Sequence, residues 1–390
     1  MPHTASARPI THIVFGSFLS ASFAIVLIYH FWDISAGGND WKQGDWLINV
    51  ETTHIRRGLF GSAILRLADL SGIPSLYLLG GLQTGLIFAS YWLLIRLLQG
   101  TLPKAAALCL IASPGFFVVT WGAEPGFSMR KEVLAFLAIM LALRTIGPDA
   151  TRHKQVFLGL SCALFGAGVG GHEANVLFLP LLLCVLLVPN PQERSRQISA
   201  AACALFATLA LLYVFANQNI TDIQDVCAPL LQRGYPQSIC SGAIAALLDD
   251  TSWPMTHLGN IISDPEAIAK YLLVLALALL PMIAIARTTS QPRRLYLAYA
   301  LAVLPFLPLY FVAVDYGRWL SLHVVSCAFL LLFFLRSNLA KLEQQVSRRS
   351  LVFFVIVGLL TAPYMTTAAP HDGIILRAIK TVQYMTGARE

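Results

Sequence analysis

The sequence contains few charged residues: Lys, Arg, Asp and Glu together make up only 12% of its 390 positions. Soluble domains carry about 25% charged residues. Hydrophobic residues fill 57% of the positions, and long apolar runs recur from one end of the chain to the other. This composition argues against a soluble globular protein and favours an integral membrane protein, because lipid is the solvent that such runs require.

Cysteine is also sparse, and its spacing excludes several kinds of site. No CxxC motif and no Cys/His cluster has the spacing of a metal site, so we expect neither a zinc ion nor another cofactor. Internal repeats and low-complexity tracts are absent, which predicts a single membrane domain over residues 1–390. Five of the seven cysteines lie inside apolar runs and are predicted to be small core residues: Cys109, Cys162, Cys184, Cys203 and Cys327.

The apolar runs predict an all-α fold with about eleven transmembrane helices. The first run is too long for a signal peptide and no cleavage site follows it, so it is predicted to remain as the first helix. The expected spans are 12–32, 75–98, 104–121, 131–147, 155–171, 174–189, 196–216, 267–287, 294–314, 319–336 and 350–366.

The distribution of charge predicts the orientation of these helices. With the N-terminus in the cytoplasm, the inner segments hold 15 of the 27 basic residues, and basic residues in short loops stay on the cytoplasmic side. The C-terminus then lies on the outer side of the membrane. The net charge of +7 therefore reflects membrane topology, and no nucleic-acid partner is expected. Of the 20 acidic residues 17 fall on the outer side, where a functional site is one explanation.

The first outer segment combines acidic residues and tryptophans with the pair Arg56–Arg57. Trp41 and Trp46 are typical of the membrane interface, but an arginine pair is unusual on the outer side. From Gly58 to Leu70 the pattern predicts an amphipathic helix, partly embedded in the outer leaflet, whose polar positions are Arg66 and Asp69.

Three further outer connections place charged residues at a membrane boundary. Arg130–Lys131 begins one predicted helix, and the alternatives are an anion site or a snorkelling anchor. His172–Glu173 separates two apolar runs with almost no loop, which indicates a functional site or a structural polar pair between helices. Asp315 and Arg318 belong to the shortest connection and form either part of the site or an intrachain clasp.

The loop over residues 216–267 is the only insertion with the composition of a soluble segment, and a tail over 367–390 follows the last span. Cys227 and Cys240 lie in this loop, outside the apolar runs. Since the outer compartment is oxidising, we predict a disulfide between them.

These side chains together fit one chemistry. Arginine binds phosphate oxygens in pairs through its planar fork, and a nearby carboxylate or imidazole can remove a proton from a sugar hydroxyl. A phosphate-linked lipid that carries a group for transfer would therefore suit these residues. The predicted catalytic residues are Asp40, Asp45, His172, Glu173 and Asp315. The predicted phosphate-binding residues are Arg56, Arg57, Arg130, Lys131 and Arg318.

Five short motifs resemble polytopic proteins of bacterial surface-polysaccharide clusters, a family similar to O-antigen polymerases and lipid-sugar-dependent glycosyltransferases. They are Asp45-Trp46-Leu47-Ile48-Asn49, Arg56-Arg57-Gly58-Leu59-Phe60-Gly61, Arg130-Lys131-Glu132, His172-Glu173 and Asp315-Tyr316-Gly317-Arg318-Trp319. In the glycosyltransferases an acidic residue of the first outer loop is the usual base, which implies Asp40 or Asp45. This chain has no adjacent acidic pair in that loop. The polymerases use outward-facing arginines, which this chain has.

The resemblance and the residues together predict a glycosyltransferase or polysaccharide polymerase acting on polyprenyl-(pyro)phosphate-linked sugars at the outer face of the membrane. Two alternatives stay open: a flippase for lipid-linked oligosaccharides, and a non-catalytic subunit of a polysaccharide export complex. A transporter is expected to show internal repeats and polar residues near the bilayer midplane. Here the polar groups lie at helix ends. The sequence leaves the sugar, the linkage, the acceptor and the oligomeric state undetermined.

Overall fold

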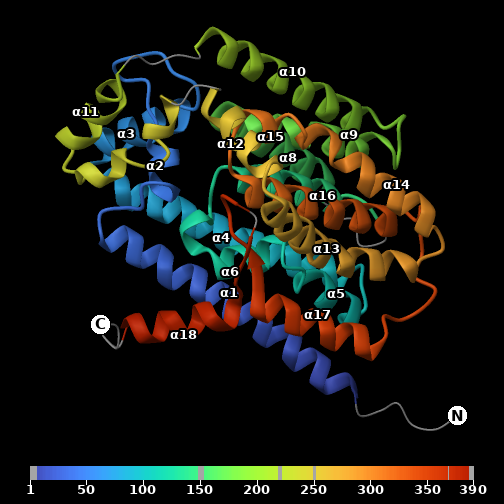
Figure 1. Ribbon diagram of the computed structural model, residues 1–390. Helices are drawn as coiled ribbons and strands as arrows, with labels where there is room; N and C mark the ends of the chain where they lie inside the picture. Colours follow the sequence, from blue (N-terminus) through green and yellow to red (C-terminus); the bar gives the residue numbers. More distant parts are fainter. Residues whose placement is uncertain (1–6, 148–152, 218–221, 249–251, 368, 386–390) are drawn as a thin grey trace, which may run out of the picture. The chain divides into compact units, whose positions relative to one another are not determined.

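The computed structural model describes residues 7–147, 153–217, 222–248, 252–367 and 369–385, and it is about 74% helical. This described part contains 18 α-helices, five short 3-10 helices and one sheet of two short antiparallel strands (Figure 1). The predicted helical fold is therefore confirmed. The strands are an addition that the apolar pattern did not predict.

The chain folds as two compact units, each built from separate stretches of sequence. The first unit comprises Met1–Val26, Leu94–Pro125 and Thr251–Glu390, and the second comprises Leu27–Leu93 and Gly126–Asp250. Helices α1 (Ala7–Ser35) and α4 (Ser75–Gln99) contribute residues to both units.

In the second unit, α8 packs between α7 and α10, and these helices run side by side with α9 (Figure 1). Its α-helices beyond α1 and α4 are α2 (Lys42–Leu47), α3 (Leu59–Ser71), α7 (Glu132–Arg144), α8 (Lys154–Gly171), α9 (Leu179–Leu187), α10 (Arg194–Ala216) and α11 (Gln224–Gln232). Its 3-10 helices are η2 (Glu173–Phe178), η3 (Gln237–Cys240) and η4 (Ala245–Leu247), and η1 (Pro125–Phe127) lies at its boundary.

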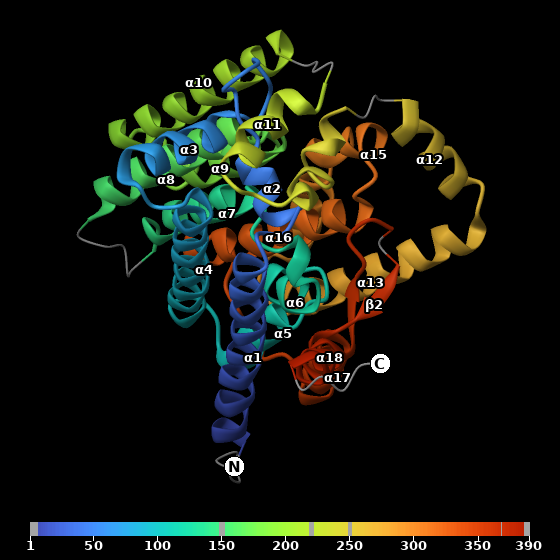
Figure 2. The same ribbon diagram turned by 90° about the vertical axis from the view of Figure 1, so that its left-hand side faces the viewer.

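In the first unit, α16 is the central helix and contacts α13 and α14, while the strands and α17 pack beside α18 (Figure 2). Its helices are α5 (Lys104–Ile111), α6 (Phe117–Ala123), α12 (Ser252–Ile262), α13 (Pro265–Arg287), α14 (Pro292–Ala302), η5 (Leu304–Phe306), α15 (Leu309–Val312), α16 (Tyr316–Arg336), α17 (Arg348–Leu360) and α18 (Ile374–Met385). Its strands are β1 (Thr361–Pro363) and β2 (Pro370–Asp372).

Within the described residues, six helices are long and apolar enough to cross a membrane, so the predicted count of about eleven is not confirmed. They are Ile10–Ser35, Ser75–Gln99, Arg194–Ala216, Pro265–Arg287, Pro292–Val312 and Tyr316–Arg336. Several of these helices expose large apolar side chains, as α10 does with Leu205, Leu209 and Phe215. Such faces suit contact with lipid and support a membrane-embedded protein.

Of the other five predicted spans, 155–171 is present as the unbroken helix α8 (Lys154–Gly171), and the other four are shorter or broken, for identifiable reasons. Span 104–121 divides into α5 and α6 at Ser113-Pro114-Gly115, because proline lacks the amide hydrogen that a helix interior requires. A Cβ at Gly115 would lie 2.8 Å from a methyl group of Val324, so this break also permits close packing against α16. Span 174–189 begins as the 3-10 helix η2, and span 131–147 retains a helix of 13 residues.

The predicted helical span 350–366 is helical only as far as Leu360. Helix α17 ends at Leu360, and the next three residues form strand β1, with Thr361 opposite Asp372 and Pro363 opposite Pro370. A proline cannot donate a ladder hydrogen bond, which fits a short two-stranded sheet. The apolar run therefore changes from helix to extended chain before it ends.

Candidate anion-binding site

The first predicted outer segment contains a buried helix, α2, in place of an interfacial belt. Trp46 is fully buried, and its indole nitrogen Nε1 donates a hydrogen bond to the carbonyl of Met129 at 2.8 Å. Lys42 is also fully buried and donates to Asp33 at 2.6 Å. The interpretation of Trp46 as a headgroup anchor is therefore wrong, because the ring packs inside the second unit against Phe60.

The predicted amphipathic helix is present as α3. A Cβ at Gly61 would overlap the carbonyl oxygen of Ile48, so glycine allows this helix to lie directly on the segment that follows α2. Ile64 and Leu65 face the protein, while Leu67 and Leu70 are exposed. This packing fixes the start of α3 immediately after Arg56 and Arg57.

Arg57 and Glu173 form the central ion pair of the candidate site. Arg57 Nε donates to both carboxylate oxygens of Glu173, at 2.8 and 3.0 Å, and Nη2 makes a further contact with Oε1. Arg56 Nη1 donates to the same oxygen at 3.2 Å. One carboxylate thus holds two guanidinium groups that come from a distant part of the sequence.

The backbone at this site is unusual in two places. Arg57 has φ +69° and Met129 has φ +58°, in the left-handed region that residues other than glycine rarely adopt. Such conformations cost about 1–3 kcal/mol each and gather at functional sites. Arg56 is held in place as well, since its amide donates to the carbonyl of Asn217 at 3.1 Å.

Lys131 joins the two arginines to His172 and Glu173. Its Nζ is buried and donates to the carbonyls of Arg57 at 3.2 Å and Gly171 at 3.0 Å. His172 Nδ1 lies 4.0 Å from Glu173 Oε2 and accepts a hydrogen bond from the amide of Ala174 at 3.2 Å. A neutral His172 therefore carries its proton on Nε2 and acts as a hydrogen-bond donor.

Asp45 and Arg130 lie beside these residues. Asp45 is fully buried, and its Oδ2 lies 3.9 Å from Nε of Arg130. The guanidinium of Arg130 also lies 5.6 Å from the centre of the Trp41 ring, a cation–π distance. We call Asp45, Arg56, Arg57, Arg130, Lys131, His172 and Glu173 the basic cluster.

Charge governs the protonation of the basic cluster. The pKa of Glu173 falls to about 2, because the attraction of Arg57 and Arg56 outweighs the burial that would raise it. Arg57 lowers the pKa of Arg56, and burial lowers the pKa of Lys131 to about 8. Four cations against two carboxylates leave an excess of positive charge, which suits an anionic ligand.

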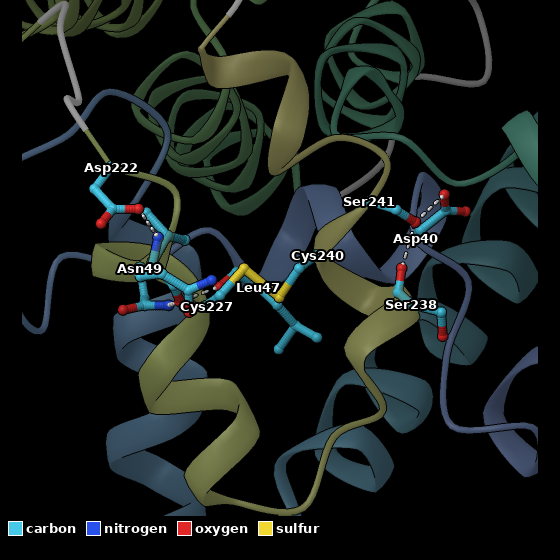
Figure 3. The surroundings of a disulfide bond; sticks show 10 residues. Asp40, Leu47, Asn49, Asp222, Cys227, Ser238, Cys240 and Ser241 are labelled. Carbon is cyan, nitrogen blue, oxygen red and sulfur yellow. Dashed lines mark hydrogen bonds between the residues drawn. A yellow bond between two sulfur atoms is a disulfide. The ribbon is translucent and has the colours of Figure 1, made fainter.

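Asp40 lies apart from the ion pairs, close to the disulfide. Cys227 and Cys240 are bonded to one another, and they join α11 to η3 (Figure 3). Ser241 Oγ donates to Asp40 Oδ2 at 3.1 Å, and the backbone of Asp40 accepts from Ala243 at 3.1 Å. Asp40 therefore anchors the segment beyond the disulfide.

Asp315 and Arg318 belong to the first unit and form an ion pair of their own at 2.9 Å. The guanidinium of Arg318 lies 5.1 Å from the centre of the Trp319 ring. This geometry is the intrachain clasp that the sequence allowed as an alternative. Their predicted catalytic and phosphate-binding roles stay predictions.

Sequence reasoning missed several residues that complete these contacts. Asn175 donates to the carbonyls of Lys131 and Gly168, and so fixes the start of η2. His371 Nε2 lies 3.0 Å from Glu124 Oε1 in the first unit, although 247 residues separate the two. No short motif links such distant positions. Within the described residues, no group of three His, Cys, Asp or Glu side chains is placed to hold a metal ion.

Comparison with known proteins adds no relative: no family model, no curated protein and no solved structure matches the chain. The contacts of the basic cluster, within a helical protein whose long helices are apolar enough to cross a membrane, are therefore the basis for assigning a function.

Proposed function

We propose that this protein is a membrane glycosyltransferase of the polymerase type, which uses a polyprenyl-(pyro)phosphate-linked sugar at the outer face of a bacterial inner membrane. The observation that carries the proposal is the basic cluster, in which Arg56 and Arg57 bind one carboxylate and the buried Lys131 donates to the carbonyl of Arg57. Planar guanidinium groups bind phosphate oxygens in pairs. The exposed apolar faces of the long helices indicate contact with lipid, and a polyprenyl chain dissolves in lipid.

In the proposed reaction, a hydroxyl oxygen of the acceptor attacks the anomeric carbon of the donor sugar. The bond from that carbon to the phosphate oxygen breaks, and the polyprenyl (pyro)phosphate leaves with the electron pair. Arg56, Arg57 and Lys131 stabilise the negative charge on the leaving oxygen. His172 donates a hydrogen bond to the same group through Nε2.

The proton of the acceptor hydroxyl passes to a carboxylate, and we assign this role to Asp45. Glu173 is a weak base, because two arginines hold its pKa at about 2. Its role is to position Arg57. Asp45 lies beside Arg130 and acts electrostatically on Lys131, so it is the second carboxylate of the basic cluster.

The disulfide supports the proposed orientation. A bond between Cys227 and Cys240 persists in an oxidising compartment such as the periplasm. Both cysteines and the basic cluster belong to the second unit. This shared unit supports a site that faces the compartment in which lipid-linked oligosaccharides are polymerised.

The test uses purified protein in liposomes that contain a polyprenyl-diphosphate-linked oligosaccharide, with chain extension read from the product ladder. Wild type extends the chain, Arg57→Gln abolishes extension, and Arg57→Lys impairs it because lysine lacks the paired donors. Arg66→Gln, on the exposed face of α3, is the matched control and retains activity. Translocation of the lipid without any extension would contradict the proposal and favour a flippase.

A further inference from the structure

A second site of different chemistry lies in the same unit as the basic cluster. A cavity of about 560 Å³ is lined by the end of α3, the start of α4 and the segment 233–236. Small-molecule sites in proteins occupy roughly 300–1,000 Å³. The volume therefore suits a ligand of a few sugar units or of similar size.

One wall of this cavity is fixed by covalent and ionic contacts. Residues 233–236 lie between Cys227 and Cys240, so the disulfide closes the loop that forms the wall. Arg233 donates to both carboxylate oxygens of Asp69, at 3.1 and 2.7 Å, and to both of Glu51, at 2.9 and 3.1 Å. Because these contacts already order the wall, ligand binding does not carry the entropic cost of ordering it.

The charges of the lining cancel. Asp69 and Arg233 are its two charged residues, and they are paired with each other. A phosphate would find the guanidinium already engaged by four carboxylate oxygens. An ammonium group at Asp69 would be repelled by Arg233, whose Nη2 lies 2.7 Å from that carboxylate. The lining therefore favours an uncharged ligand.

Aromatic and hydroxyl groups complete the lining. The Tyr77 ring is 62% exposed and offers a free face, while the hydroxyls of Tyr235 and Ser75 are hydrogen-bonded to each other at 2.8 Å. Asp69 remains about half exposed, so it can still accept hydrogen bonds from a ligand. An apolar ring face beside a carboxylate and hydroxyls matches a sugar, which has apolar C–H faces and an equatorial set of hydroxyls.

We propose that this cavity binds the uncharged saccharide portion of a glycan, with Tyr77 stacked on a sugar ring and Asp69 accepting from its hydroxyls. The inference rests on the proposed function, since it supplies a separate subsite for the acceptor or the growing chain. Leu70 and Ile73, beside the cavity, are exposed apolar residues. They place its mouth at an apolar surface, where a lipid-linked glycan would lie.

Binding is measured without any transfer reaction. Labelled wild-type protein in nanodiscs is applied to an array of uncharged di- to hexasaccharides that also carries phosphorylated glycans and phosphocholine. We expect uncharged members to bind. Tyr77→Ala should weaken the best of them at least tenfold, while Tyr77→Phe keeps the ring and stays within about twofold. Leu67→Ala, exposed on α3 but outside the lining, is the matched control.

The outcomes separate this inference from the proposed function. Arg57→Gln should abolish chain extension and leave saccharide binding unchanged, whereas Tyr77→Ala weakens binding. If binding depends on Tyr77 but no extension occurs under any condition, only the proposed function is overturned. If no uncharged saccharide binds, if Tyr77→Ala binds as wild type does, or if phosphorylated glycans or phosphocholine bind in preference, the saccharide subsite is overturned.

Discussion

At the scale of single residues, Arg57 combines two features that oppose each other energetically. Its backbone adopts φ +69°, which is costly for a side chain of this size, and its guanidinium makes the paired contacts with Glu173. The ion pair offsets the strain of the backbone. The motif Arg56-Arg57-Gly58 thus presents two guanidinium groups at a position that relaxed backbone would not reach.

The coupling between Arg57 and Glu173 is testable by a double-mutant cycle. Both side chains are less than one fifth exposed, so Glu173→Gln leaves buried guanidinium groups without their carboxylate and should lower the free energy of unfolding by about 3 kcal/mol. The double variant Arg57→Gln/Glu173→Gln should lose less than the sum of the single variants, by about 1–3 kcal/mol. Denaturant melts in detergent give the values, and additivity within about 0.5 kcal/mol would rule out the coupling.

The same pair predicts a dependence on pH. The pKa of Glu173 in the folded protein is about 2, below its ordinary value of 4.5, so its stabilising contribution is complete above pH 4.5 and is lost as the pH falls towards 2. Wild type should therefore lose more stability between pH 5 and pH 3 than Glu173→Gln does. If wild type and Glu173→Gln lose the same stability between pH 5 and pH 3, the ion pair contributes nothing.

At the scale of elements, the sequence predicted those features that local pattern determines. The polar positions Arg66 and Asp69 marked α3 as amphipathic, and the pairing of Cys227 with Cys240 followed from their place outside the apolar runs. Contacts between distant segments left no local pattern. Two examples are the ion pair of Arg233 with Asp69 and the hydrogen bond from the buried Trp46 to the carbonyl of Met129. Both depend on packing that a single sequence does not reveal.

The disulfide should stabilise the α11–η3 segment. It closes a loop with a sequence separation of 13, for which the chain-entropy estimate is about 3 kcal/mol. The variant Cys227→Ser/Cys240→Ser should therefore melt at a lower temperature, and a reductant should lower the melting temperature of wild type but not of the variant. Cys184, predicted as a core residue, is an exposed free thiol in the structure, and Cys184→Ser serves as the control. Alkylation of both cysteines without prior reduction would show that the bond is absent.

Helix α18 should detach from α6 in a way that depends on pH. Burial raises the pKa of Glu124 to about 7 and lowers the pKa of His371, its partner at 3.0 Å, while Asp372, Arg377 and Lys380 also act on the carboxyl. A raised carboxyl pKa contributes stability that is complete below pH 4.5 and lost as the pH rises through 7. The contribution of His371, lost at acidic pH, is constant above pH 6.5.

The informative window is therefore pH 4.5 to 7, over which the Glu124 contribution falls, and comparison with Glu124→Gln isolates it because His371 is present in both proteins. Hydrogen exchange of α18 amides should increase across this window in wild type, beyond the intrinsic increase of exchange with pH. Glu124→Gln should remove the excess, because the amide does not titrate. An equal excess in the variant would show that another group controls the docking of α18.

At the scale of the whole molecule, hydropathy identified apolar segments but did not reveal what each one contacts. Helices α7 and α16 are apolar and almost entirely buried in protein, whereas α10 exposes leucine and phenylalanine side chains along its length. Both kinds of helix produce the same apolar run in the sequence. Length and composition decide the count: predicted spans such as 104–121 and 350–366 are broken or end early, and six helices of the described chain qualify, the buried α16 among them.

The orientation predicted from the basic residues depends on whether the chain crosses the membrane between Arg349 and Asp372. Helix α17 has 13 residues and rises about 20 Å. Strand β1 adds three residues at about 3.3 Å each. Together they reach about 30 Å, the thickness of the hydrocarbon core, at the turn between the strands, and the antiparallel β2 then returns so that Asp372 lies opposite Thr361. One edge of β1 is paired with β2, and Ala362 and Pro363 are buried in protein, so this extended piece is shielded from lipid.

We therefore expect reporter fusions after Arg349 to read cytoplasmic and fusions after Asp372 to read periplasmic. A fusion after Gly234, within the disulfide loop, is the matched periplasmic control, because the bond between Cys227 and Cys240 requires an oxidising compartment. Cytoplasmic readings after both Arg349 and Asp372 would show that α17 and β1 do not cross. The reverse of the whole pattern would overturn the orientation, and with it the assignment of the basic cluster to the compartment in which lipid-linked glycans are polymerised.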